Sequence, residues 1–365
     1  MRLLVMRYRF IGDTILTVPF LRNLRRAYPG ARIEMMVAPY SSEVLRGTPY
    51  VDEFLVYDPP TIHADSQGRH ASLLSKIRFL ADLRRRRYDK AYVLKRSFSS
   101  AVIGFLTGAR ERIGFDTEGR GFLLTRRVPY RHDRHEVRNF LEVLMADGVE
   151  IVDDHLEAWI SVEERQFADE FLAGGDPAGK GIVAIHPFSA NPVRAWHEDN
   201  FVALANTLQE RHGVGILMLG GARDRELAAS MAGRIVPPPC MAVGNTTLRQ
   251  SMALLSRCRL LVCNDSGVMH LCAAFGVPLV ALFGPQSPVK FGPWGENAEV
   301  ITKRFACSPC QQRFFEECQP SPRGKPYCME EISVDEVLER ALCTLRRPPH
   351  EPHTGSGRRR SSSPE

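Results

Sequence analysis

The chain has 365 residues, of which 44% are hydrophobic and 25% charged; this is the composition of an ordinary globular protein, long enough for two domains. No apolar run reaches the ~18 residues of a membrane span, and Arg7 and Arg9 interrupt the N-terminal apolar run too early for a signal peptide. We therefore expect a cytoplasmic protein.

The net charge of +6 is spread unevenly along the chain. Residues 58–139 contain 18 Lys/Arg against 9 Asp/Glu, so the excess of positive charge lies in the first half. Such a surface favours an anionic partner, either a phosphorylated glycan or an anionic membrane. Nucleic acid is not expected, because basic and aromatic residues are not interleaved as in RNA-binding motifs.

The first half alternates strands and helices. Leu3 to Tyr8 predicts a strand, and a turn at residues 10–13 leads into a helix predicted from Thr14 to Tyr28, with apolar residues on one face. Further strands are predicted at residues 32–38, 54–57 and 90–94, and helices at about 74–87, 99–107 and 133–147. This alternation predicts a parallel, doubly wound α/β sheet.

A second series of the same kind follows the linker-like segment Gly174–Pro177. Strands are predicted at 181–186, 214–219, 259–263 and 279–283, and helices at 199–211, 224–234, 248–256 and from Asp265 or Ser266 to about Gly276. The predicted domains are therefore 1–173 and 174–346. Residues 347–365 have almost no apolar side chains and should be disordered.

Three turns of the second half are richer in polar residues than folding requires. Ser189, Arg194 and Ser266, together with helix amides, could hold a pyrophosphate, because strand C-termini of open α/β sheets converge on one crevice. Asp224 or Glu226 could reach a ribose or sugar hydroxyl. The alternative is that these residues are only helix caps and surface ion pairs. The turns are His186–Trp196, Gly220–Glu226 and Asn264–Gly267, the last followed one turn later by His270.

The corresponding turn of the first half carries Asp13. This residue is a good N-cap, but a carboxylate at the end of the first strand, facing an anion-binding second domain, is also where a general base would lie. Neither half has the G-x-G-x-x-G or Walker A pattern after a strand. That absence disfavours dehydrogenases and phosphate-loop enzymes.

Four of the nine cysteines lie in a polar, Pro-rich loop with the spacing C-x2-C-x7-C-x9-C. They are Cys307, Cys310, Cys318 and Cys328. In a cytoplasmic protein this pattern favours a structural zinc site over disulfides. A reduced or redox-sensitive loop is the alternative.

Taken together, the motifs resemble glycosyltransferase family 9, the ADP-heptose:lipopolysaccharide heptosyltransferases. The resemblance covers most of residues 1–345, and its specificity comes from the order and spacing of five segments. They are RYRFIGDTILTVPFLRNLRRAYPGARI, HEVRNFLEVL, HPFSANPVRAWHEDNFVALANTL, GGARDRE and CNDSGVMHLCAAFGVPLVALFGPQSP. In place of a common Gly-Ala pair after His-Pro, this chain has Phe188-Ser189.

The resemblance implies a GT-B fold, with two Rossmann-like domains facing a central cleft. It implies inverting transfer of a heptose from ADP-heptose to the Kdo/heptose inner core of lipopolysaccharide, with no metal required for catalysis. Asp13 would be the general base, and Arg194, in the position of a common lysine, would meet the diphosphate. The donor site would be lined by Asp265, Ser266, Gly267 and His270.

The acceptor implied by this resemblance is an anionic lipid at the inner face of the inner membrane, so we expect peripheral membrane contact. Candidate acceptor-binding residues are Lys95, Arg96, Arg126 and Arg127. The alternatives are a family member that uses another nucleotide sugar and a non-catalytic nucleotide-sugar-binding subunit of envelope assembly, which Asp13 argues against. A sugar-nucleotide epimerase needs no acceptor groove, so the basic first half argues against that class.

Overall fold

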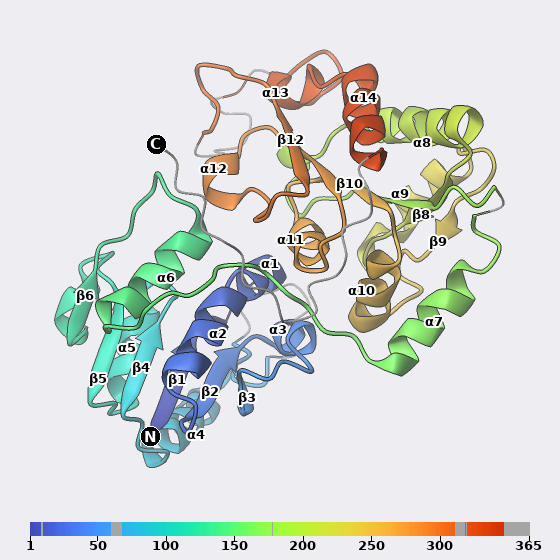
Figure 1. The fold of residues 1–365 in the computed structure, drawn as a ribbon. Helices are drawn as coiled ribbons and strands as arrows, with labels where there is room; N and C mark the ends of the chain where they lie inside the picture. Colours follow the sequence, from blue (N-terminus) through green and yellow to red (C-terminus); the bar gives the residue numbers. More distant parts are fainter. Residues whose placement is uncertain (9, 60–67, 177, 311–317, 319, 347–365) are drawn as a thin grey trace.

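The structure, a computed structural model, describes all residues except 9, 60–67, 177, 311–317, 319 and 347–365. The tail predicted to be disordered therefore lies outside the described residues. The rest of the chain forms two sheets of six strands each, with helices packed around both (Figure 1). The prediction of an α/β protein with two doubly wound halves is confirmed.

The first sheet has the strand order β3-β2-β1-β4-β5-β6, and every neighbouring pair is parallel. Its strands are β1 (Arg2–Met6), β2 (Arg32–Val37), β3 (Glu53–Val56), β4 (Lys90–Val93), β5 (Glu111–Phe115) and β6 (Arg126–Val128). The helices of this half are α1 (Ile11–Ile15), α2 (Val18–Ala27), α3 (Pro39–Val44), α4 (Leu73–Arg85), α5 (Phe98–Leu106), the 3-10 helix η1 (Arg120–Leu123) and α6 (Glu136–Ala146).

The helices of the first half cover both faces of its sheet. Along β1, Leu3 and Val5 belong to a core that includes residues of α2 and α6, whereas Leu4 and Met6 belong to a second core with residues of α4 and α5. This alternation follows from the two-residue period of a strand. It explains why Leu3 to Met6 of β1 are all apolar instead of alternating with polar residues.

The second sheet has the order β12-β11-β10-β7-β8-β9, again with every pair parallel. Its strands are β7 (Ile182–His186), β8 (Gly215–Met218), β9 (Cys240–Met241), β10 (Leu260–Asn264), β11 (Leu279–Phe283) and β12 (Ala298–Thr302). The helices are α8 (Glu198–His212), α9 (Arg225–Ala232), α10 (Leu248–Ser256), α11 (Gly267–Ala274), α12 (Pro288–Phe291), α13 (Tyr327–Glu330) and α14 (Val334–Leu345), with 3-10 helices η2 (Pro192–Arg194) and η3 (Ala222–Asp224).

In the second half, α8 and α14 pack together on one face of the sheet, where Val183 and Ile185 point. On the other face lies α10, which also packs against α7 (Val162–Leu172). Helix α7 is thus in contact with the second half, although it precedes the glycine linker.

One local prediction was wrong. The helix predicted from Thr14 to Tyr28 is two helices, α1 and α2, and Pro19 stands in the first turn of the second one. Proline fits a helix start and cannot continue a helix that is already under way. The predicted start of α11 at Asp265 or Ser266 is confirmed, since Ser266 stands at its N-cap, although the Ser266 side chain makes no capping hydrogen bond.

The two halves meet at the C-terminal ends of their sheets, where α1 packs against α11 (Figure 1). In the first sheet the chain reverses its direction of winding between β1 and β4, and in the second between β7 and β10. The crevice at such a switch point is where open α/β sheets bind ligands. Both switch points lie at the same junction.

Candidate functional site

Asp13 lies in α1, directly after β1, and forms an ion pair with Arg7. The Arg7 Nη2 to Asp13 Oδ2 distance is 2.6 Å, and both side chains are largely buried. The Arg7 guanidinium also lies over the Phe140 ring, 5.2 Å from its centroid. Asp13 is therefore a fixed, oriented carboxylate. The sequence showed Arg7 only as a break in an apolar run, and its pairing with Asp13 was not predicted.

Helix α1 approaches α11 through Gly12. A Cβ atom at Gly12 would lie 2.8 Å from His270 Cδ2 and 3.4 Å from the Cα of Gly267. Only glycine permits this approach without displacing the buried imidazole. The turn that carries Asp13 and the turn predicted to form the donor site are thus in direct contact.

Asp265 is the buried carboxylate of the second-half turn. Burial raises its pKa to about 6, although the Arg194 guanidinium acts in the opposite direction. Arg194 Nη1 lies 3.2 Å from Asp265 Oδ2. The structure therefore brings together two residues that the sequence assigned to separate turns.

Three buried polar atoms near this junction have no hydrogen-bond partner among the described residues. They are Ser266 Oγ, His270 Nδ1 and His186 Nδ1. Leaving such groups unpaired costs free energy, so a ligand that bonds to them would be favoured. Burial lowers the pKa of both His186 and His270 to about 4, which keeps both rings neutral at pH 7. The amides that begin α11 add the donors that an anion needs.

The loop after β7 is held beside this turn by Asn264. Its Oδ1 accepts a hydrogen bond from the Trp196 backbone N–H at 2.9 Å, and its Nδ2 donates to the Pro187 carbonyl at 2.8 Å. Ser189 lies in the same loop and accepts from the Asn191 N–H at 3.3 Å. The loop that carries Ser189 and Arg194 is thereby fixed to the end of β10.

The third polar turn, Gly220–Glu226, contributes less to this candidate site. Asp224 accepts a hydrogen bond from the Gly221 N–H at 2.9 Å and so caps its own turn. It is also close enough to His186 to favour protonation of that ring. Glu226 is exposed in the first turn of α9. The roles predicted for both residues in sugar binding stay predictions.

Two of the four candidate acceptor-binding residues lie at the C-terminal edge of the first sheet. The Lys95 ammonium is 4.3 Å from the centroid of the Tyr8 ring, and the Arg96 guanidinium is 4.2 Å from that of Tyr130. The segment is shaped by Arg120, which was not predicted. Its buried guanidinium donates to the carbonyls of Phe115 and Ser97 at 2.8 and 2.9 Å.

The other two candidates lie on the edge strand β6. Arg126 pairs with Glu111 and Asp147, at 3.6 and 3.7 Å, near the amino ends of β4 and β5. Arg126 therefore lies at the amino ends of the strands, whereas Lys95 and Arg96 lie at their carboxyl ends. Arg127 follows it and is exposed.

The four loop cysteines differ in exposure: Cys307 and Cys310 are exposed, Cys318 is partly buried and Cys328 is buried. Burial raises the pKa of Cys328 to about 12, and the other three thiols add to this effect. The described residues contain no group of three or more His, Cys, Asp or Glu positioned to hold a metal ion. Residues 311–317 and 319 of this loop lie outside the described part.

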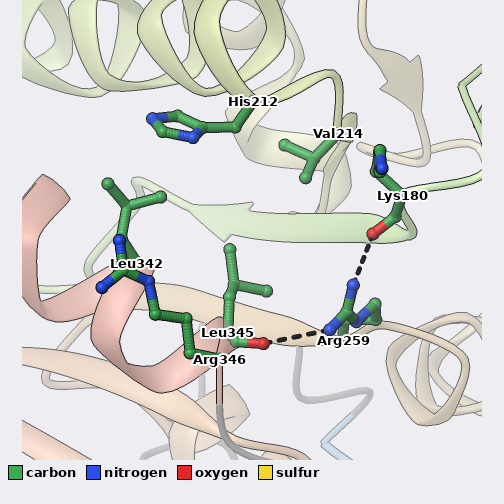
Figure 2. Close-up of a pocket in the computed structure, with 7 residues that line it drawn as sticks. All are labelled: Lys180, His212, Val214, Arg259, Leu342, Leu345 and Arg346. Carbon is green, nitrogen blue, oxygen red and sulfur yellow. Dashed lines mark hydrogen bonds between the residues drawn. The ribbon is translucent and has the colours of Figure 1, made fainter.

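A pocket of about 180 Å³ lies elsewhere in the second half (Figure 2). Its Arg259 guanidinium donates to the carbonyls of Lys180 and Leu345, at 2.7 and 3.0 Å. Arg259 immediately precedes β10, so the pocket is at the amino edge of the sheet, opposite to Asp265. It is lined by Lys180, His212, Val214, Arg259, Leu342, Leu345 and Arg346.

A family model described as glycosyltransferase family 9 (heptosyltransferase) matches residues 77–318. The chain belongs to this family. Relatives of this family 9 glycosyltransferase include lipopolysaccharide heptosyltransferase 2 of Escherichia coli K12, which is 29% identical over 316 residues, covering 82% of this chain and 88% of the relative. Lipooligosaccharide heptosyltransferase 2 of Haemophilus ducreyi is 27% identical over 319 residues, with the same coverages.

Solved structures agree with this assignment. A family 9 glycosyltransferase from Veillonella parvula superposes with a TM-score of 0.81 at 26% identity, covering 94% of this chain and 97% of the other. The E. coli ADP-heptose lipopolysaccharide heptosyltransferase II has the same fold, with a TM-score of 0.75 at 24% identity, covering 94% and 98% of the two chains. The predicted GT-B fold is confirmed. Within the described part of this glycosyltransferase, no helix is both long and apolar enough to cross a bilayer.

Proposed function

We propose that this glycosyltransferase transfers a heptose from ADP-heptose to a hydroxyl of the lipopolysaccharide inner core, with inversion at the anomeric carbon. The names of its relatives point to this donor and this class of acceptor. The observation that carries the proposal is the contact between the Asp13 turn and the Asp265–His270 turn. A carboxylate and the N-terminus of a helix thereby share one junction.

In the proposed reaction Asp13 takes the proton of the acceptor hydroxyl. The oxygen attacks the anomeric carbon of the donor as the bond from that carbon to the diphosphate breaks, and ADP leaves with the bonding electron pair. The Arg7 guanidinium keeps Asp13 in its orientation. The negative charge that grows on the diphosphate would be met by the first amides of α11, by Ser266 Oγ and by Arg194.

The test is release of ADP by purified protein given ADP-heptose, with and without a Kdo–lipid A acceptor that lacks heptose. We expect release that depends on the acceptor. If another nucleotide sugar supports transfer and ADP-heptose does not, the heptose assignment fails while the mechanism stands. If no nucleotide sugar is turned over, the binding-subunit alternative takes precedence.

Peripheral membrane contact is also part of the proposal, and α4 supports it. The first turns of this helix expose Leu73, Leu74 and Ile77, at 74%, 56% and 52% of their surface. Residues 68–87 hold seven Lys/Arg and one Asp. Exposed apolar side chains among basic ones are typical of helices that lie on anionic bilayers. We propose that this face of α4 contacts an anionic bilayer surface, because the negative charge of the bilayer complements the positive charge of the helix.

A structural zinc held by the four loop cysteines remains a proposal. The spacing of the thiols in the sequence supports it, whereas the described geometry does not. Metal analysis of protein purified without chelator tests it. About one zinc ion per chain would support the site, and none would remove it.

A further inference from the structure

Tyr130, just after β6, is contacted by two cations from different halves of the molecule. The Arg96 guanidinium carbon lies 4.2 Å from the ring centroid, and the Lys290 ammonium lies 4.9 Å from it. Arg96 follows β4 in the first half, whereas Lys290 belongs to α12 in the second. Helix α12 lies on the side of the second half that faces α6 (Figure 1).

The charge at this ring is not balanced within the described residues. Neither Arg96 nor Lys290 forms an ion pair there, and the neighbouring carboxylate of Glu136 accepts the hydrogen bond of the Tyr130 hydroxyl. Burial and the charge of Arg96 both lower the pKa of Lys290, and Glu136 opposes this only in part. The two cations therefore repel each other, and an anion between them would relieve that repulsion.

We propose that Arg96 and Lys290 together bind an anionic group of the acceptor, a phosphate or a carboxylate, beside Tyr130. The assignment rests on the proposed function and adds Lys290, a residue of the other half, to the acceptor site. Arg7, which pairs with Asp13, lies over the ring of Phe140. Phe140 is one turn of α6 after Glu136, the hydrogen-bond partner of Tyr130. Tyr130 and the Arg7–Asp13 pair are therefore on the same side of α6.

The competing explanation is that both cations only stack on Tyr130 and so hold the two halves together. Cation–π contacts alone can do this. The two explanations differ in which kinetic constant changes. A stacking role alters stability and leaves the acceptor KM alone, whereas an anion site alters the acceptor KM and leaves the KM for ADP-heptose alone.

The test compares Lys290→Gln and Arg96→Gln with the wild type, using ADP-heptose and Kdo–lipid A. We expect each variant to raise the acceptor KM about tenfold, as for loss of one charge-assisted contact, with the ADP-heptose KM changed less than about twofold. The matched control is Lys180→Gln, in the pocket of Figure 2, which should change neither constant. An unchanged acceptor KM in both variants, or a raised KM for ADP-heptose instead, overturns the proposal.

Two modified acceptors identify the anion. One has its lipid phosphates removed, and the other has its sugar carboxylates reduced to alcohols. With the acceptor that lacks the bound group, Lys290→Gln should cause no further rise in the acceptor KM. A full tenfold rise in KM with both modified acceptors overturns the assignment. Calorimetric binding of Kdo–lipid A to the wild type and to Lys290→Gln decides this proposal even if heptose transfer fails. Equal affinities would then reject it.

Discussion

Asp13 can be tested without disturbing the residue that orients it. In Asp13→Asn the amide oxygen still accepts from Arg7, so the buried guanidinium keeps a partner while the basic oxygen is lost. We expect kcat to fall by about 10²- to 10⁴-fold, the usual contribution of a general base.

ADP release in steady state measures this loss, and calorimetry should find the affinity for ADP unchanged. Asp335→Asn, an exposed carboxylate in the first turn of α14, is the matched control. Turnover of Asp13→Asn within tenfold of the wild type would remove the assignment of Asp13 as the base.

Asp265 makes the free energy of unfolding depend on pH, and a single substitution isolates this effect. Burial raises the pKa of this carboxyl to about 6, so the folded state binds its proton more tightly than the unfolded state does. The resulting stabilisation is complete below about pH 4 and is lost as the pH rises through 6. The unfolding free energy of the wild type, relative to Asp265→Asn, should fall over this range by at most ~1.4 kcal/mol per pH unit.

Urea denaturation of both proteins between pH 4 and pH 7.5 measures this difference. His186 and His270 act with the opposite sign over the same range, because burial lowers the pKa of each to about 4. Their contribution is present in both proteins and cancels in the comparison. A difference that does not change with pH would contradict the raised pKa of Asp265.

At the scale of residues, the sequence pointed to those candidate site residues that follow a strand directly. Asp13 and the turn at 265–267 were proposed in this way, because a polar turn after an apolar run is visible locally. Arg7 and Lys290 were not proposed from the sequence. The pairing of Arg7 depends on how α1 folds back, and the position of Lys290 depends on how two separate halves meet.

Among the secondary-structure elements, α4 offers the sharpest test. Replacing Leu73, Leu74 and Ile77 by serine should weaken binding to anionic vesicles at least about tenfold, because each exposed side chain loses apolar contact with the bilayer. Flotation with vesicles containing 30% anionic lipid, against purely zwitterionic ones, measures this change. These residues are exposed, so the unfolding free energy should change little.

Leu227→Ser is the matched control for α4, since this leucine is an exposed apolar residue on α9 of the second half. It should leave vesicle binding unchanged. Equal binding by the α4 variant and the wild type would show that this helix is not the membrane contact. The same variant tested with a detergent-solubilised acceptor should keep its turnover.

The elements differ in how well their sequences predict them. Long apolar runs such as β10 and β11 were predicted to within a residue or two, because strands buried on both faces are apolar throughout. The edge strands β6, β9 and β12, and the neighbouring strand β5, were not predicted. They are short or contain charged residues, as in Arg126-Arg127-Val128, and only their neighbours in the sheet define them. Helix α7 was also missed, although the capping box of Ser161 and Glu164 marks its start.

For the whole molecule, the contact between α1 and α11 can be tested at Gly12. In Gly12→Ala the new methyl group would press on the buried His270 ring, at 2.8 Å from Cδ2, and separate the two turns. We expect the free energy of unfolding to fall by about 1–3 kcal/mol, as for an overpacked core, and turnover to fall more than tenfold.

Chemical denaturation and ADP release provide both measurements. The double variant Gly12→Ala/His270→Ala should recover part of the lost stability, because the ring that the methyl group meets is gone. Additive losses in the double variant would show that the two residues are not in contact. Gly30→Ala, where a Cβ would meet nothing within 4 Å, is the control for the substitution itself.

The two-sheet organisation was predicted from the alternation of strands and helices, whereas the junction between the halves was not. Nothing local in the sequence indicates that His135 of the first half stacks on Trp294 of the second, with ring centroids 4.5 Å apart. Nor does it show that His135 Nε2 lies 2.9 Å from the Gly292 carbonyl oxygen. Such contacts depend on the final positions of two sheets that are far apart in the sequence.

The junction between Gly12 and Gly267 has a consequence for motion during turnover. A Cβ at Gly267 would lie 3.3 Å from the Gly12 nitrogen, so the two backbones touch with no side chain between them. The Ile11 side chain lies 3.7 Å from the same position, so separating the two turns would expose apolar surface, at a free-energy cost that contacts made by a bound substrate can change. We expect the two halves to separate more often once the nucleotide has left, because a nucleotide bound at this junction would add contacts to both turns.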